Sequence, residues 1–551
     1  MSPLTSFDTH SPKPENVDKV YAAWSDPDNY RLGAVVDDIL PRRGRGQHSR
    51  FPSAVHLLSH EGAKVFGSGP EYFKTIRRRA LYAELRGIAR EVGDLDLPED
   101  PPNGEGARHW RLLVAPRRRS TSAADFATLS PALQALRETH AQLGLARAAD
   151  LGGFPADLPF DPAHPDPRQF GIVDGTMGAS FSRVSVIHSG GLDHLVNSRA
   201  TTGPPRLQSI VHHKKKDGRK YAGINYVVLL ADTASGWVTI GVDRALGGEN
   251  VTAVSLIEAA AAKAPGFRGV LSDRMIVGWP SSRLLRELGL VCYHLPVAQH
   301  ETSEEVAAAR LSTQSLLAAR GIHAGLSSPP VKELALLAME AEHDGEALLP
   351  LGKSVYTNSM GRLVVVDSVA IPLDLVEHHA PTAAPHEHLL YVDDDSLVEV
   401  RYVDGRPFKV QRAAGVLAEV IRDPDGSHAL HTRWQLDCTA GPFEVDLVWR
   451  PSQGDCEPHQ STRPDRQRAL ARLAPISRAD GAAMDTHGIR SRVEAYFSRY
   501  DAAQGRGGFA MYLDLDHQLL DFIAFAQLTN SLALHASRFA GPAASTQRTP
   551  S

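Results

Sequence analysis

The chain has few cysteines and no long apolar run, and both absences restrict what it can be. Its 551 residues include three cysteines, Cys292, Cys438 and Cys456, which are too few and too scattered for a disulfide framework. No apolar stretch approaches the roughly 20 residues that a membrane-spanning helix needs. The sequence therefore predicts a protein of a reducing compartment, located in the cytoplasm and not bound to a membrane.

An excess of positive charge, which many nucleic-acid binders show, is also absent. The 59 Lys and Arg residues are outnumbered by 64 Asp and Glu residues, and the net charge is −5. The placement of basic residues nevertheless matters more than their sum. Basic runs occur at Arg77 to Arg79 and Arg117 to Arg119. Further candidate contacts to DNA phosphates are Arg42, Arg43, Arg45, Lys214, Lys215 and Lys216.

Turn-rich segments and changes of pattern divide the sequence into five parts. The segment GGFPADLPFDPAHPDPRQ is dense in Pro, Gly and Asp and ends a first, mostly helical region. A second polar, Pro-containing stretch, PSQGDCEPHQSTRPDR, precedes the last helices. The expected parts are 1–165 (helical), 166–300 (strands and helices), 301–473 (a β-rich insertion), 474–540 (helices) and 541–551 (a disordered tail).

The part that follows residue 165 has the pattern of a mixed α/β fold. Three strand-like segments, QFGIVDGT, YAGINYVVLLAD and GWVTIGVDRAL, are followed by a helix, a strand, a helix and a strand. A meander that leads into alternating helices and strands indicates a mixed sheet covered by helices. The order βββαβαβ matches the ribonuclease H-like arrangement. The insertion carries further alternating runs separated by Asp-Gly turns.

Two aspartates follow apolar runs of this predicted sheet. Asp174 comes after Ile172 and Val173 and precedes Gly-Thr, and Asp273 comes after Val270 and Leu271. Because ligands favour the edge at which strands end, we expect both carboxylates at one sheet edge. An aspartate at a strand end is by itself usually a turn or helix-cap residue, so the pair carries the interpretation.

A third carboxylate lies on a predicted helix near the C-terminus. Its apolar face consists of Ile489, Val493, Tyr496 and Tyr500. Arg490 and Glu494 lie four residues apart on a stripe beside that face. This spacing allows Glu494 to point from a packed helix toward the sheet edge, and it equally allows an exposed ion pair with Arg490.

This helix resembles the signature of a large group of DDE-type insertion-sequence transposases, in which a tyrosine, an arginine, a glutamate and a lysine recur at fixed spacing. Arg490 and Glu494 match, whereas His487 and Asp501 occupy the tyrosine and lysine positions. The segments IVDGT and VLSDR, followed by LLRELGL, resemble the regions around the two catalytic aspartates. The group also has a β-rich insertion before the glutamate helix, and here 494 − 273 = 221 positions separate the last two carboxylates.

The resemblance implies a transposase that cuts and joins DNA with Asp174, Asp273 and Glu494 as catalytic residues and metal ligands. Two Mg²⁺ ions, for which Mn²⁺ can substitute, suit such carboxylates. Phosphate contacts are assigned to Arg490, and to Arg499 or Arg506 in place of the missing lysine. The implied partners are the inverted repeats at the element's ends and the target DNA, bound by a homodimer in the nucleoid.

Two alternatives stay open at this point. One is a ribonuclease H-like metal-dependent nuclease that cuts DNA without joining it. The other is a decayed or domesticated transposase that only binds DNA. The departures at His487 and Asp501 favour this alternative, and the three retained carboxylates argue against it.

Other polar and aromatic residues are interpreted as structural. Asp193-His194 and His212-His213 are expected in loops, and Cys456 with His459 lacks the second pair that a zinc site needs. Trp279 and Trp434 are expected to be buried rather than to stack on a DNA base.

Overall fold

The structure is a computed structural model, and it describes a defined set of residues. These are 14–40, 51–116, 128–179, 184–189, 192–197, 207–210, 212–216, 219–245, 248–272, 275–294, 353–357, 363–370, 376–378, 387–393, 396–403, 406–437, 441–458, 470, 493–504 and 515–539. The chain forms two compact units. The first comprises residues 1–156, 170–267 and 491–551, and the second comprises 157–169 and 268–490.

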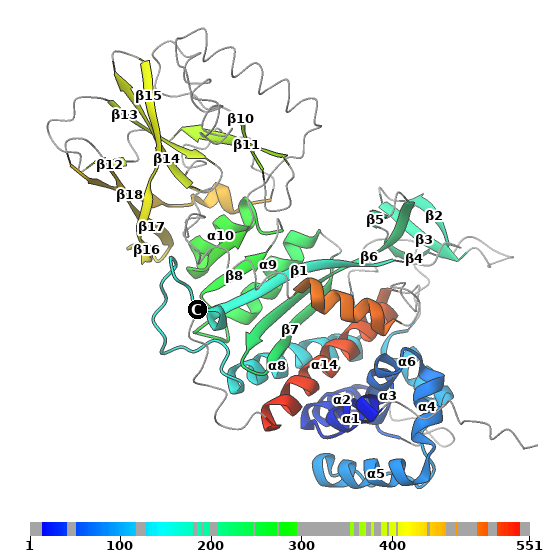
Figure 1. The fold of residues 1–551 in the computed structure, drawn as a ribbon. Coiled ribbons are helices and arrows are strands. Elements are labelled where there is room, and N and C mark those ends of the chain that lie inside the picture. The colour runs from blue at the N-terminus through cyan, green and yellow to red at the C-terminus, as the bar shows by residue number, and fades with distance from the viewer. Residues whose placement is uncertain are drawn as a thin grey trace, which may run out of the picture. The chain divides into compact units, whose positions relative to one another are not determined.

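The first unit contains an antiparallel arrangement of strands (Figure 1). Strand β6 (Arg219–Thr233) pairs with β1 (Phe170–Ala179), with β5 (His212–Lys216) and with β7 (Gly236–Arg244). β6 and β7 are joined by a tight turn in which the Thr233 hydroxyl donates to the Gly236 carbonyl at 2.6 Å. Gly236 has a φ of 124°, a conformation that favours glycine.

Helices cover both faces of this arrangement. Helix α9 (Glu249–Ala261) contacts β1, β6 and β7, while α8 (Pro131–Asp150) and α14 (Leu515–Phe539) pack against β7. The long apolar helix expected near the C-terminus is α14, which is buried from Leu515 to Leu528 and exposed toward its end. None of the helices in the described ranges is long and apolar enough to cross a membrane.

The N-terminal helices of the first unit are α1 (Pro14–Trp24), α2 (Pro27–Ile39), α3 (Ser53–Val65), α4 (Gly69–Ile76), α5 (Arg79–Gly93) and α6 (Gly104–Val114). Three of these helices begin directly after a capping residue. Asp26, Ser68 and Asn103 each accept a hydrogen bond from a backbone N–H of the helix they precede, which is the usual role of a capping residue.

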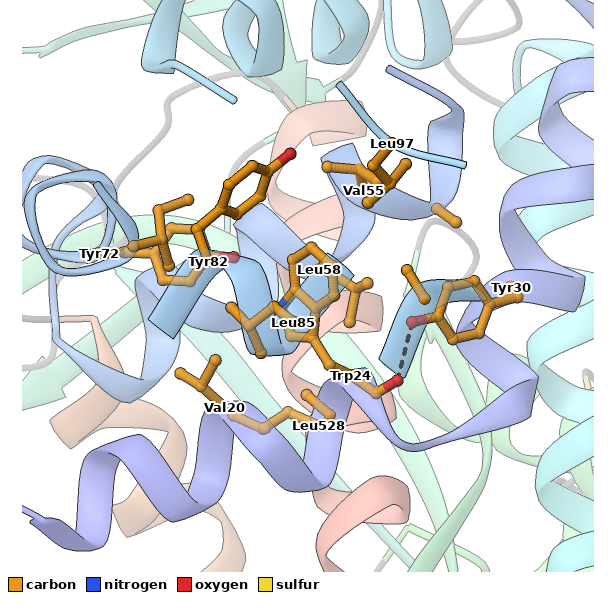
Figure 2. Close-up of a cluster of buried hydrophobic side chains, with 14 residues drawn as sticks. Val20, Trp24, Tyr30, Val55, Leu58, Tyr72, Tyr82, Leu85, Leu97 and Leu528 are labelled. Atoms are coloured by element: carbon orange, nitrogen blue, oxygen red, sulfur yellow. Dashed lines mark hydrogen bonds between the residues drawn. The ribbon is translucent and has the colours of Figure 1, made fainter. Parts of the chain in front are cut away.

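The core of these helices includes a residue of the C-terminal helix α14. Figure 2 shows Trp24, Leu58 and Leu85 around the centre of the cluster, with Leu528 of α14 beside Val20. All of them are buried. The N-terminal helices therefore share one apolar core with the end of the chain.

A buried polar network also links the N-terminal helices to α14. Arg147 of α8 forms an ion pair with Asp26, between Nη2 and Oδ1, at 2.8 Å. Ser531 of α14 donates to Asp26 Oδ2 at 2.7 Å, and Gln527 donates to the same oxygen at 3.1 Å. Because a buried charge is tolerated only when it is paired and hydrogen-bonded, these contacts fix the position of α14 relative to the start of α2.

The second unit begins with the parallel pair β8 (Gly269–Ser272) and β9 (Val291–His294), joined by α10 (Trp279–Leu288). Gly289 has a φ of 67° and ends α10, as glycine commonly does. The strands between residues 353 and 449 form two sheets, with the strand orders β10-β11-β13-β14-β15 and β12-β18-β17-β16. The bounds of their strands follow. They are β10 (Lys353–Thr357), β11 (Leu363–Ala370), β12 (Val376–His378), β13 (Glu387–Asp393), β14 (Ser396–Val403), β15 (Arg406–Arg412), β16 (Ala414–Arg422), β17 (His428–Leu436) and β18 (Phe443–Trp449).

The fold is mixed α/β, with antiparallel and parallel strand pairs and helices, as the sequence predicts. The expected order of three strands, helix, strand, helix and strand corresponds to β1, β6, β7, α9, β8, α10 and β9. Trp434 is buried as expected, and Trp279 is half-buried. Between β1 and β6, the strands β2 (Val184–Ser189), β3 (Leu192–Asn197) and β4 (Leu207–Ile210) form a small sheet that the sequence did not predict.

The two histidine-containing pairs expected in loops lie in strands. Asp193 and His194 belong to β3, and His212 and His213 belong to β5. Each strand is short and rich in polar residues, so its composition resembles a loop, and its strand geometry comes from pairing with a neighbour. His194 lies opposite Ile210 of β4, and His212 lies opposite Gly223 of β6.

Candidate functional site

Asp174 lies within strand β1, at the point where its buried part ends. Ile172 and Val173 are buried, whereas Asp174, Gly175 and Thr176 are half-buried. The expectation that Asp174 closes the strand was wrong, because β1 continues to Ala179. The Gly-Thr pair that suggested a turn is instead paired with β6, whose 15 residues extend well past the position of Asp174.

The strand register shows which face of the sheet carries Asp174. Ile172 is two residues away and therefore shares its face. Ile172 lies opposite Leu230 of β6, and Leu230 lies opposite Thr239 of β7. The Thr239 hydroxyl is 3.1 Å from the Tyr496 hydroxyl. Asp174 therefore lies on the face of the sheet against which the helix of residues 493–503 packs.

The opposite face carries a different carboxylate. A Cβ atom on Gly175 would lie 2.8 Å from Cδ of Glu249, the first residue of α9. Asn225 of β6 donates to Glu249 Oε1 at 2.7 Å. Because successive residues of a strand point to opposite faces, Glu249 lies on the face away from Asp174. The glycine at position 175 leaves room for Glu249 and is not part of a turn.

The helix of residues 493–503 has the apolar face that the sequence predicts. Val493, Tyr496 and Tyr500 are buried, and the ring of Tyr500 lies 4.2 Å from that of Phe522 of α14, centroid to centroid. Burial raises the pKa of both tyrosines above the usual range of a phenol, so they act as neutral packing groups. Figure 1 shows this helix in orange beside α14 in red.

Glu494 lies on the outer side of the same helix. Its side chain is exposed, so a ligand from solution can reach it. Arg499 lies five residues further along, with its guanidinium 5.0 Å from the centre of the Trp237 ring at the start of β7. Tyr496 meets β7 two residues later, at Thr239. The helix thus runs back along β7, and its Glu494 end lies toward the C-terminal part of that strand.

The residues paired across the sheet with Asp174 reach β7 in the C-terminal part of that strand. Asp174 lies opposite Val228, and Val228 lies opposite Val242. Trp237, which stacks under Arg499, lies opposite Asp232. Val228 and Asp232 are four residues apart on β6, or about 13 Å at roughly 3.3 Å per residue. Going from Arg499 to Glu494, the helix therefore approaches the residues of β6 and β7 that are paired with Asp174.

The same sheet face holds a buried ion pair that sequence reasoning missed. Arg244, at the end of β7, forms an ion pair with Asp516 of α14, between Nη1 and Oδ1, at 2.6 Å. The Tyr226 hydroxyl lies within 3.3 Å of the Leu515 carbonyl and 3.2 Å of Gln518 Oε1. These contacts hold the start of α14 against the paired residues Tyr226 and Arg244, which lie opposite Thr176, two residues along β1 from Asp174. The signal in the sequence was an aspartate that begins an otherwise apolar helix.

Several predicted site residues lie outside the described part of the chain. Asp273, the residue after the last one of β8, belongs to this group together with Arg490, Arg506, Arg42, Arg43 and Arg45. Lys214, Lys215 and Lys216 lie in β5, opposite Tyr221 to Arg219 of β6. Within the described residues, no three His, Cys, Asp or Glu side chains are close enough together to hold a metal ion.

No family model matches this chain, and no curated protein matches it either. Its functional interpretation therefore depends on the motifs in its sequence and on the arrangement of Asp174 and Glu494 described above. Both are carboxylates within reach of solvent, and their oxygens are the hard donors that Mg²⁺ prefers. The donor chemistry of these two residues fits the divalent ions that the resemblance implies.

Proposed function

We propose that this chain is a DDE-type DNA transposase with a ribonuclease H-like core. The observation that carries the proposal is that Asp174 and the helix of Glu494 occupy the same face of one sheet. The signature pair Arg490 and Glu494 supports it, as does the order of strands and helices from β1 to β9. Glu249, an acidic residue that lies against β1 on the other face, is excluded from the proposed ligand set by its position.

In the proposed site, Asp174, Asp273 and Glu494 would hold two Mg²⁺ ions, whose charge would supply stabilisation of the attacking and leaving oxygens of an in-line displacement at phosphorus. Asp174 would be a ligand of both ions, and Asp273 and Glu494 of one each. Arg490 holds a phosphate near the scissile bond, because a guanidinium forms paired hydrogen bonds to phosphate oxygens. Arg499 lies five residues further along the helix, over Trp237, so its phosphate contact is assigned to DNA away from the scissile bond.

Two displacements at phosphorus make up the proposed reaction. In the first, the oxygen of water bonds to phosphorus and the P–O3′ bond breaks, which leaves a 3′-hydroxyl at the element's end and a 5′-phosphate. In the second, the oxygen of that 3′-hydroxyl bonds to a target phosphorus, and the target's own 3′-oxygen leaves and takes up a proton. The energy of the target bond is kept in the new bond, so no further reactant is required. A homodimer would hold two ends for this step.

The test uses the full-length chain and a DNA fragment that contains its gene with both flanks. With Mg²⁺ or Mn²⁺, we expect cleavage at the element's ends and joining of the released ends to a second, supercoiled DNA. Asp174→Asn, Asp273→Asn and Glu494→Gln should abolish both steps. Asp232→Asn, which removes a carboxylate at the far end of β6, serves as the matched control. Cleavage without joining would indicate a nuclease instead, and binding without cleavage would indicate a DNA-binding protein.

A further inference from the structure

The carboxylate of Glu249 lies against β1 directly behind Asp174. Its Cδ and both its oxygens are 2.8 to 3.0 Å from the place that a Cβ atom on Gly175 would take. Gly175 follows Asp174 in β1, and neighbouring residues of a strand point to opposite faces. The two carboxylates therefore lie on opposite sides of one short stretch of backbone, and no side chain of residue 175 separates that backbone from Glu249.

The connection from β7 to α9 fixes the position of Glu249. Asn225 of β6 accepts a hydrogen bond at its carbonyl from the backbone N–H of Ala245 at 2.8 Å. Its side chain donates to Glu249 Oε1 at 2.7 Å. Gly248, immediately before α9, has a φ of 107°, a conformation that favours glycine. Asn225 thus holds both the backbone that leads into α9 and the side chain of its first residue.

The carboxylate of Asp174 depends on the same stretch of backbone. Its Oδ1 atom accepts a hydrogen bond from the N–H of Gly175 at 2.8 Å. A shift of the peptide between these two residues would move both this donor and the Cα atom that carries the carboxylate. Loss of a group that orients a metal ligand commonly weakens metal binding by roughly 10- to 100-fold. A group that holds this peptide in place can therefore control metal binding without touching the metal.

Other glycines on this face of the sheet meet apolar groups. A Cβ atom on Gly171 of β1 would meet the ring of Phe267. A Cβ atom on Gly241 of β7 would meet Leu256 of α9. At Gly175 the contact is instead a carboxylate, which has to be hydrogen-bonded to be tolerated in a half-buried position. An apolar group would fill the space equally well, but a hydrogen-bonded carboxylate is also fixed in its orientation.

We propose that Glu249 is a positioning residue of the carboxylate site. Held by Asn225, it keeps the peptide between Asp174 and Gly175 in place and thereby orients the Asp174 carboxylate. Glu249 acts through packing and orientation and is not itself a metal ligand. The inference rests on the proposed function, which makes Asp174 a ligand of divalent ions. It also gives a reason for the glycine after Asp174, because an alanine there would displace the carboxylate of Glu249.

The test measures Mn²⁺ binding to the full-length chain without DNA, from the electron paramagnetic resonance signal of the free ion. The binding that Asp174→Asn loses defines the site. Gly175→Ala and Glu249→Ala should each weaken this binding by roughly 10-fold. Glu249→Gln keeps the size of the side chain and its hydrogen-bond acceptor, so its affinity should stay within a few-fold of wild type. The matched control is Gly241→Ala, whose methyl group would lie 3.1 Å from Leu256 of the same helix, and it should bind Mn²⁺ like wild type.

The double variant Gly175→Ala/Glu249→Ala separates positioning from a general loss of structure. Its added methyl group stands in the space that the carboxylate leaves, so it should bind Mn²⁺ no more weakly than Glu249→Ala alone. Losses that multiply to about 100-fold, as for independent sites, would overturn the inference. So would wild-type binding by either single alanine variant, at unchanged circular dichroism, or an equal loss in Glu249→Gln and Glu249→Ala, which would assign the effect to charge. If Asp174→Asn binds Mn²⁺ like wild type, the proposed function fails and this inference fails with it.

Discussion

The buried histidine of α8 allows a quantitative prediction about acid stability. The side chain of His140 is 1% exposed, and its Nε2 atom has no hydrogen-bond partner. Burial lowers the pKa of His140 to about 4, and it is the only cause of the shift. In the unfolded chain the same group has a pKa of about 6.5. As the pH falls below 6.5, the unfolded chain therefore binds a proton that the folded chain excludes, and stability is lost.

The size of the effect follows from the two pKa values. At pH 8 neither state is protonated, so His140 contributes nothing to the pH dependence. At pH 5 the unfolded state is favoured by RT ln(1 + 10^1.5), with a small correction for the folded state, or about 2 kcal/mol. This is a large part of the roughly 5–15 kcal/mol that stabilises a folded protein.

The assay is urea unfolding at pH 8 and pH 5, followed by circular dichroism, for wild type and His140→Leu. Any packing change caused by leucine changes the free energy of unfolding equally at both pH values, so it cancels in the difference between them. The variant should lose about 2 kcal/mol less than wild type between pH 8 and pH 5. Leu133→Val removes a buried methylene group of the same helix and no titratable group, so it should keep the wild-type difference. An unchanged pH dependence in His140→Leu would refute the argument.

Two further predictions concern the N-terminal helices α2 and α3. Burial and the nearby Asp26 raise the pKa of Glu61 well above its usual value, so its contribution to stability is present below pH 4.5 and is lost as the pH rises. Glu61→Gln should therefore raise the melting temperature at pH 8 more than at pH 4, and an equal change at both would contradict this. A Cβ atom on Gly33 would lie 2.3 Å from the backbone nitrogen of Ala54. Gly33→Ala should thus lower the free energy of unfolding by roughly 1–3 kcal/mol or more, whereas Gly87→Ala, with open space around it, should not destabilise the chain.

Local pattern was sufficient to predict most elements of the fold. The continuous apolar run of β6 and the apolar length of α14 indicate their type without help from distant contacts. β5 was missed because its residues are polar, and β3 was missed because its apolar residues Leu192, Leu195 and Val196 do not alternate with polar ones. The strand structure of both depends on pairing with neighbouring strands. The end of β1 was misplaced for a related reason, since Gly175 accommodates Glu249, which is 74 positions away, as 249 − 175 shows.

The candidate site could be predicted only in part. The apolar face of Val493, Tyr496 and Tyr500 is a local property, and the structure confirms its burial. The sheet face that this helix covers depends on the contact between Tyr496 and Thr239, which are 257 positions apart. The buried pairing of Lys64 with Asp521 is another long-range contact. Such contacts have no periodic signal in the sequence, because each joins polar groups of two elements that lie far apart in the chain.

The central claim is that Asp174 belongs to a metal-dependent site that cuts DNA. It is tested most directly by the rate of end cleavage in Mg²⁺ for wild type, Asp174→Asn and Asp232→Asn. Loss of a ligand to a catalytic metal ion removes several kcal/mol of transition-state stabilisation, so Asp174→Asn should be slower by roughly 100-fold or more. Asp232→Asn should cleave at the wild-type rate. Cleavage by Asp174→Asn within a few-fold of wild type would contradict the assignment.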